Sequence, residues 1–355
     1  MYINIHKILS PNTLLIKKSL IFFVIFFFVC SILNSEHNLP WVSYTSEKYC
    51  FISFAFLCCY FLISSQKILL PIIIIPIGLM VFIPVIQYLF GVIVFFETMF
   101  FSSMYLFCFF CSVLIGYNFN DRLLFSRLVC NMFLFVGVIS SCIVIIQWLD
   151  FYNLQPYIIK IQTGRPYANL GQPNQLSTIL IISLCSLWYL YEYENKKIYN
   201  YIALLLLFSI VLTQSRTAWL VFLCLVIYYF LVKKRVNFSL KVRAIFLYII
   251  FFVFSLIFLP YYNSILDFFN IGLKTSTFYE RITTGYSRLD IWEYLYHALL
   301  EKPWTGYGWY QTQIANVSGM GNAPTKMVLD SSHNIALDIL RSEEHTSELQ
   351  SPDHL

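Results

Sequence analysis

The sequence predicts an all-α protein that crosses a membrane many times. Of its 355 residues, 59% are hydrophobic and 12% are charged, whereas a soluble domain has about 25% charged residues. Apolar runs of about 20 residues, the length that crosses the hydrocarbon core, recur along the chain. The runs lack the strict alternation of β-barrel strands, so helices must satisfy the backbone polar groups. This composition excludes a soluble enzyme, a nucleic-acid-binding protein and a secreted disulfide scaffold.

Nine hydrophobic segments are predicted to span the membrane, and a tenth begins near Ile335. They cover residues 19–33, 50–64, 68–86, 98–116, 128–149, 175–191, 199–213, 217–232 and 244–260. Lys17 and Lys18 precede the first segment, which places the N-terminus in the cytoplasm by the positive-inside rule. No small-residue cleavage site follows, so we expect an uncleaved span instead of a signal peptide. A long outer loop then covers residues 261–332.

The distribution of basic residues agrees with this orientation. Of the 22 Lys and Arg residues before position 341, thirteen fall on the predicted cytoplasmic side. Five of the nine outer ones lie in the long loop 261–332, where the charge rule has little force. All ten cysteines lie in or at the edge of hydrophobic segments. We expect them to pack as small apolar side chains and to form neither disulfides nor metal sites.

The last stretch of sequence differs sharply from the rest. Residues 341–355 read RSEEHTSELQSPDHL and resemble the conceptual translation of a sequencing-library adapter. We therefore expect a non-native tail and a fragment whose single membrane domain covers residues 1–340. Without the tail, Lys plus Arg falls from 23 to 22 and Asp plus Glu from 18 to 14, so the net charge is +8 instead of +5. A natural polar C-terminal tail is the alternative.

Polar residues gather at three places on the predicted outer side, and the first is the loop GRPYANLGQPNQLST at residues 164–178. Asn174, directly after Pro173, is a predicted N-cap of the sixth membrane helix. The positive dipole end of that helix favours anions. Arg165 lies nine residues before Asn174 and can fold back over the same place. The alternative is a capped turn with an interfacial arginine and no ligand.

The second place is TQSRTAWL, residues 213–220, in a very tight turn between two apolar segments. Arg216 lies there at the membrane boundary without neighbouring acids in the sequence. A guanidinium is costly at this depth unless it snorkels or binds an anion. Arg216 is therefore either a phosphate ligand or a side chain that snorkels to lipid headgroups.

The third place is the long outer loop, which contains a predicted helix in SRLDIWEYLYHALLEKPWTGYGWY, residues 287–310. Ser287 and Asp290 form a capping box at its start. Arg281 and Arg288 stand just before this helix and at its beginning. His333 follows next to the final membrane entry, where a structural role is the alternative to a catalytic one. His297, on the helix itself, is expected to be structural.

Together these places suggest chemistry on a phosphorylated substrate. Guanidinium forks suit phosphate or pyrophosphate, and imidazole suits proton removal near neutral pH. No acidic cluster or Cys/His spacing predicts a divalent metal site. A lipid-linked substrate would place its headgroup at this level. The candidate residues from this reasoning are Arg165, Arg216, Arg281, Arg288 and His333.

These motifs resemble the bacterial O-antigen ligase superfamily, which also contains O-antigen polymerases and protein O-oligosaccharyltransferases. The loop at residues 164–178 is most similar to the protein O-oligosaccharyltransferase branch. LPWVSYTSE (39–47) and IPVIQYLFG (83–91) are supporting matches. TQSRTAWL, the R-x-x-x-W pattern from Arg288, the P-W-x-G-x-G run and the His333-Asn334 pair fit the wider superfamily.

The resemblance implies transfer of an oligosaccharide from undecaprenyl pyrophosphate to Ser or Thr hydroxyls of exported proteins such as pilin. It implies no metal or nucleotide cofactor, and a multi-pass protein of the bacterial inner membrane with a periplasmic active site. By position, His333 matches the histidine that activates the acceptor hydroxyl, and Arg216 and Arg288 match arginines that hold the pyrophosphate. The branch's own loop motif is matched by Arg165, Gln172 and Asn174.

Other activities remain open at this stage. O-antigen ligation to the lipid A core and O-antigen polymerisation use the same donor and differ only in acceptor. A transporter or flippase is the non-enzymatic alternative. Transporters place ionisable groups near the bilayer midplane and often have interrupted helices in paired halves. The spans predicted here are nearly free of charge and show no internal repeat, which favours an enzyme.

Overall fold

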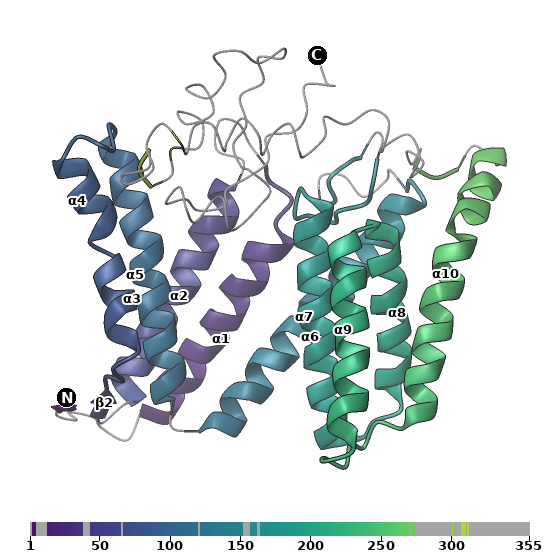
Figure 1. Ribbon diagram of the computed structural model, residues 1–355, viewed down its shortest axis with the longest axis horizontal. Coiled ribbons are helices and arrows are strands. Elements are labelled where there is room, and N and C mark those ends of the chain that lie inside the picture. The colour runs from purple at the N-terminus through teal and green to yellow at the C-terminus, as the bar shows by residue number, and fades with distance from the viewer. Residues whose placement is uncertain are drawn as a thin grey trace. The chain divides into compact units, whose positions relative to one another are not determined.

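Helices make up most of the structure, a computed structural model, in the residues that it describes (Figure 1). These residues are 2–4, 13–37, 43–64, 67–119, 121–151, 157–161, 164–269, 271–273, 300, 307–309 and 311. The predicted sites Arg281, Arg288 and His333 lie outside them, as do the helix start at 287, the tenth segment and the tail 341–355.

The helices agree with the predicted all-α class. They are α1 (Thr13–Leu33), α2 (Tyr44–Ser64), α3 (Ile74–Met80), α4 (Ile83–Leu89), α5 (Phe96–Asn118), α6 (Arg122–Trp148), α7 (Pro173–Glu194), α8 (Ile198–Thr213), α9 (Arg216–Lys233) and α10 (Val242–Phe268). Two short strands, β1 (Tyr2–Asn4) and β2 (Lys67–Leu69), pair antiparallel.

Seven helices in the described part of the chain are long and apolar enough to cross a membrane. They are α1, α2, α5, α6, α7, α9 and α10. Helix α8 has 16 residues, which gives it a length of about 24 Å at 1.5 Å per residue. The prediction of a multi-pass helical membrane protein is confirmed.

The third predicted segment departs from a single span. Where one helix was expected over 68–86, the chain forms β2 and then two short helices, α3 and α4. Pro84 lies in the first turn of α4. A proline ring clashes with the carbonyl of the residue four positions earlier, here Met80 at the end of α3, which favours the break between the two short helices.

Helix α10 also differs from the prediction, because it continues past the expected start of the outer loop at residue 261. It includes Pro260 and ends at Phe268. Near this end, the Asn263 Oδ1 atom accepts a hydrogen bond of 2.9 Å from the indole of Trp148 at the end of α6. A polar contact between two helix ends therefore stabilises the additional turns.

The described chain divides into two compact units. The first contains Met1–Lys17, Cys58–Asn120 and Ile282–Leu355, and the second contains Lys18–Leu57 and Asp121–Arg281. In the first unit, the Asn118 side chain at the end of α5 accepts a hydrogen bond from the backbone N–H of Leu69 and donates one to its carbonyl oxygen. This pairing extends the small sheet through a side-chain amide.

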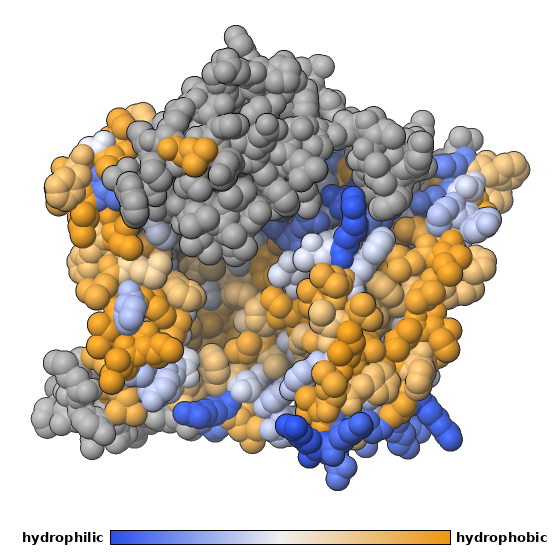
Figure 2. Space-filling model, in the orientation of Figure 1, coloured by the Kyte–Doolittle hydropathy of each residue, from blue (hydrophilic) through white to orange (hydrophobic). Residues whose placement is uncertain are grey.

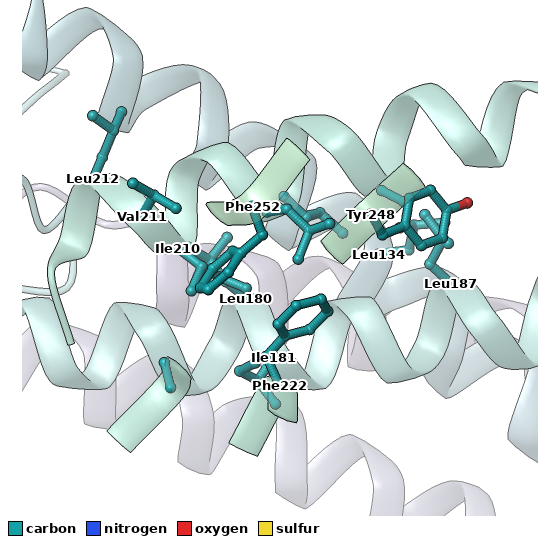
Figure 3. Packing of buried hydrophobic residues seen from close by; sticks show 14 of the residues in the cluster. Leu134, Leu180, Ile181, Leu187, Ile210, Val211, Leu212, Phe222, Tyr248 and Phe252 are labelled. Atoms are coloured by element: carbon teal, nitrogen blue, oxygen red, sulfur yellow. The ribbon is translucent and has the colours of Figure 1, made fainter. Parts of the chain in front are cut away.

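The core of the second unit lies among α6, α7, α8, α9 and α10. Leu180 of α7 and Ile210 of α8 are fully buried, and the rings of Phe222 and Phe252 lie 4.8 Å apart between α9 and α10 (Figure 3). Lipid is as apolar as these side chains, so close packing, more than escape from water, holds such helices together.

A polar contact joins the starts of two helices of the second unit, which therefore lie at the same end of that unit. At one end, Tyr248 near the start of α10 donates to Asn200 near the start of α8 over 2.6 Å. Figure 2 shows apolar surface along α9 and α10 between hydrophilic bands at their ends. The basic residues in the turn between α7 and α8, in the turn between α9 and α10, and at the adjoining ends of α9 and α10 were predicted to be cytoplasmic: Lys196, Lys197, Lys233, Lys234, Arg235, Lys241 and Arg243.

Helices α6 and α7 approach closely at Gly137. A β-carbon at this position would lie 2.3 Å from the Ser183 Oγ atom. That hydroxyl donates a 2.7 Å hydrogen bond to the carbonyl of Phe133 on α6. A side chain at 137 would therefore force the two helices apart and break a hydrogen bond between them.

We predict that Gly137→Ala lowers the free energy of unfolding by about 1–3 kcal/mol, the usual cost of overpacking. Thermal unfolding in detergent, followed by tryptophan fluorescence, measures the change. Gly116→Ala in α5 is the matched control, because a β-carbon there meets no atom within 4 Å. Equal melting temperatures for the two variants would contradict the proposed close approach.

Candidate functional site

An irregular loop before α7 is held in place by the side chain of Gln147, which is buried near the end of α6. Its Oε1 atom accepts hydrogen bonds from the backbone N–H groups of Tyr167 and Ala168, at 3.2 and 2.8 Å. Its Nε2 atom donates to the carbonyls of Ile159 and Ala168, at 3.0 and 2.8 Å. Ala168 has a φ of 53°, a conformation that is unfavourable for a residue with a β-carbon. The two bonds from one carboxamide stabilise it.

A second buried carboxamide, that of Asn169, joins the same loop to the end of α1. Its Nδ2 atom donates to the carbonyls of Leu33 and Tyr157, at 2.8 and 2.9 Å. The Asn169 carbonyl oxygen lies 2.9 Å from the Nε2 atom of His37. The segment after α1 and the loop before α7 are therefore one hydrogen-bonded structure.

The structure brings Arg165 to the tight turn that contains Arg216. The Arg165 Nη1 atom donates a long hydrogen bond of 3.4 Å to the carbonyl of Thr213, the last residue of α8. Gln214 then adopts a φ of 50° and Ser215 precedes α9, whose first residue is Arg216. Arg165 and Arg216 were predicted from separate motifs, and the fold brings the Arg165 side chain to the turn that contains Arg216.

This turn, residues 213–216, concentrates positive potential. The first turn of α9 contains no acidic residue, and the helix dipole adds partial positive charge to that of Arg216. Ser215, which is 1% exposed, has the extended backbone of an N-cap residue, yet its hydroxyl forms no capping bond. The Ser215 Oγ atom has no hydrogen-bond partner among the described residues. An anion bound here would lie at the positive end of α9 and could accept a hydrogen bond from the Ser215 hydroxyl.

The predicted N-cap of α7 is wrong by two residues. The helix begins at Pro173, and Gln172 is the N-cap, without a side-chain capping bond. Proline is favoured at the first helical position because its fixed φ suits the helix and it needs no N–H partner there. Asn174 therefore lies inside the first turn, where its carbonyl accepts from the Ser177 and Thr178 hydroxyls.

In the first compact unit, the structure joins two other predicted motifs. The Gln87 side chain of α4 accepts a 2.9 Å hydrogen bond from the backbone N–H of Trp309. Gln311 donates to the carbonyl of Val92 over 3.2 Å. Gly308 has a φ of 101°, and a β-carbon there would lie 3.1 Å from Val92. The glycine of the P-W-x-G-x-G run thus permits a close backbone contact with the turn after α4.

Two titratable groups of the second unit's loops are shifted by burial. Burial raises the pKa of the Asp150 carboxyl, and the positive charge of Lys160 opposes that rise. Burial also raises the pKa of the Tyr167 phenol, which therefore stays neutral in the physiological range. The loop near Arg165 thus gains no negative charge from Tyr167.

The fold reveals three residues that the sequence patterns did not single out: Gln147, Asn169 and His37. Asn169 lies inside the quoted loop motif, and His37 lies two residues before LPWVSYTSE. The sequence could have pointed to Gln147 because it is a polar residue at the end of an apolar span. Among the described residues, no three His, Cys, Asp or Glu side chains lie close enough to hold a metal ion. The metal-independent reaction stays a prediction.

The fold and the loop together define a multi-pass helical membrane protein with a cationic, hydrogen-bonded site at one set of helix ends. Residues 201–341 match the O-antigen ligase family, and residues 166–191 match the protein glycosylation ligase family. These matches confirm the resemblance to the O-antigen ligase superfamily.

Two curated proteins of Acinetobacter baylyi are similar to the chain. It is 37% identical over 317 residues to a general O-oligosaccharyltransferase, and the matched stretch covers 87% of this chain and 55% of that protein. It is 35% identical over 268 residues to a ComP-specific O-oligosaccharyltransferase, and the matched stretch covers 73% of this chain and 47% of that protein. The chain therefore spans about half the length of these relatives. No solved structure matches it significantly.

We predict that Gln147→Met loosens the loop before α7, because methionine keeps the side chain's length but cannot form the four hydrogen bonds. Hydrogen–deuterium exchange at Tyr167 and Ala168 is expected to accelerate, and the unfolding free energy to fall by about 1–3 kcal/mol per backbone group left unsatisfied. Gln175→Met, at an exposed position in α7, is the control. Unchanged exchange in Gln147→Met would refute the role of Gln147.

Proposed function

We propose that the protein transfers an oligosaccharide from undecaprenyl pyrophosphate to Ser or Thr hydroxyls of exported proteins such as pilin. The reaction takes place at the periplasmic face of the bacterial inner membrane. The observation that carries the proposal is the junction of the 164–172 loop with the Arg216 turn, through the Arg165–Thr213 contact. Two guanidinium groups from separate motifs thereby come to one helix N-terminus, an arrangement that suits a pyrophosphate.

Similarity to the two relatives supports a protein acceptor. Both are O-oligosaccharyltransferases by name, and one is named as ComP-specific. The match to the protein glycosylation ligase family begins at Pro166 and ends within α7. It therefore covers the loop that Gln147 and Asn169 hold in place. This loop is where a protein-directed member would differ from an O-antigen ligase.

The proposed reaction needs an acceptor, a base and a stabilised leaving group. The acceptor oxygen attacks the anomeric carbon, and the bond between that carbon and the pyrophosphate oxygen breaks. The electron pair leaves with the pyrophosphate, whose growing charge Arg165, Arg216 and Arg288 stabilise. His333 takes the proton of the acceptor hydroxyl. Gln172 and Asn174 belong to the donor-binding loop, and Arg281 adds positive charge.

Two related activities use the same donor and another acceptor. An O-antigen ligase would transfer the glycan to lipid A core, and a polymerase would transfer it to a growing glycan. The O-antigen ligase family match over 201–341 is common to all of them. The acceptor is therefore tested directly, by asking which molecule gains the glycan.

We predict that Arg216→Ala weakens binding of undecaprenyl pyrophosphate by about 10- to 100-fold, because it removes a charge-assisted contact worth about 1.5–3 kcal/mol. Binding is measured on protein in nanodiscs by titration with the lipid. Arg243→Ala, an exposed arginine at the start of α10, is the matched control and should bind normally. An affinity for Arg216→Ala equal to that of the wild type would exclude the assigned contact.

We predict that His333→Ala abolishes transfer without loss of protein from the membrane. A positioned general base contributes about 10²- to 10⁴-fold to a rate. Cells that supply a lipid-linked oligosaccharide and a pilin report transfer as a mass increase on pilin Ser or Thr. His297→Ala should retain activity, because that histidine is expected to be structural. Full activity of His333→Ala would remove its catalytic role, and glycan found only on lipopolysaccharide would defeat the protein acceptor.

A further inference from the structure

His37 lies beside the loop of the candidate site, although it comes from a distant part of the sequence. It follows the end of α1, and its Nε2 atom lies 2.9 Å from the carbonyl oxygen of Asn169. Its ring also lies close to Gly171, where a β-carbon would be 3.6 Å from Cε1 and 3.7 Å from Nδ1. Gly171 directly precedes Gln172. The imidazole thus lies next to the loop motif that the family branch shares.

The hydrogen bond to Asn169 determines the tautomer of His37. A carbonyl oxygen only accepts, so Nε2 must carry the proton. In the neutral ring Nδ1 is then a hydrogen-bond acceptor. This Nδ1 atom is buried and has no partner among the described residues. Buried polar atoms nearly always have a partner, and an exception calls for a ligand or another explanation.

The polar groups along the loop differ in charge from one end to the other. Arg165 and Arg216 supply positive charge near the Thr213 carbonyl. Near Gly171 lie the His37 imidazole and, next in the sequence, the carboxamide residues Gln172 and Asn174. Guanidinium groups suit a pyrophosphate, and groups that both donate and accept hydrogen bonds suit hydroxyls. A sugar pyrophosphate has these two parts in series.

We propose that His37 is a specificity-determining residue whose Nδ1 atom accepts a hydrogen bond from a hydroxyl of the donor sugar. This inference rests on the proposed glycosyl transfer and assigns the sugar-binding part of the same site. Asn169 holds the ring through Nε2, and Gly171, whose β-carbon would lie 3.7 Å from Nδ1, presents no side chain to that atom. The contact distinguishes a sugar-bearing carrier from the carrier alone.

Two substitutions separate this role from a purely structural one. His37→Gln places an N–H near the position of Nε2 and keeps the bond to Asn169, but it has no acceptor at the position of Nδ1. His37→Asn places its amide near the position of Nδ1 and cannot reach the Asn169 carbonyl. If His37 only holds the loop, His37→Gln should behave as the wild type and His37→Asn should not.

The test compares binding of undecaprenyl pyrophosphate with binding of the same carrier bearing one N-acetylglucosamine, using full-length protein in nanodiscs. The wild type is expected to prefer the sugar-bearing carrier by about threefold to tenfold, the effect of one neutral hydrogen bond. His37→Gln should lose this preference and keep its affinity for the carrier alone. His37→Asn should keep the preference in part, and it decides the matter if His37→Gln does not fold.

Each other outcome overturns a specific statement. A His37→Gln variant that keeps the sugar preference overturns the role of Nδ1. A folded His37→Asn variant that loses the preference while His37→Gln keeps it assigns His37 a structural role. A wild type that binds the carrier alone but shows no preference for the sugar-bearing carrier overturns this inference alone. A wild type that binds neither lipid overturns the proposed donor, and the assignment of His37 falls with it.

Discussion

Backbone hydrogen bonding is the constraint on which the candidate site depends. A helix satisfies its own N–H and C=O groups, but the irregular chain before α7 cannot, and an unpaired backbone group at membrane depth is costly. Two buried carboxamides solve this problem. Gln147 pairs with Ile159, Tyr167 and Ala168, and Asn169 pairs with Leu33 and Tyr157. These bonds hold the loop that carries Arg165 and that His37 contacts through the Asn169 carbonyl.

Electrostatics then give the site its two parts. The turn between α8 and α9 combines two guanidinium groups with the positive end of a helix, an arrangement that favours an anion. The neighbouring loop before Gln172 offers neutral amide and imidazole groups. The close helix packing of α6 to α10 provides a rigid base for both parts, because contacts such as Gly137 with Ser183 leave little freedom for sliding.

Most of the fold was predictable, and its exceptions have local causes. Eight of the nine predicted apolar segments coincide with helices, because lipid requires continuous runs of apolar residues. The third segment was wrong because Pro84 ends the continuity of a run whose composition is still apolar. The α7 N-cap was wrong because Pro173 competes with Asn174 for the start of the helix, and proline at the first position was the stronger preference.

The sequence by itself determined that this protein lies in a membrane, that it is helical, which family it resembles and which residue types occur at its site. These follow from composition and from short motifs, which need no knowledge of the fold. Only the tertiary structure decided which motifs meet: Arg165 with the Thr213–Arg216 turn, Gln87 with Trp309, and His37 with Asn169, which are 132 positions apart. The physical reason is that helix packing, which depends on side-chain shape at each contact, selects the neighbours of each loop.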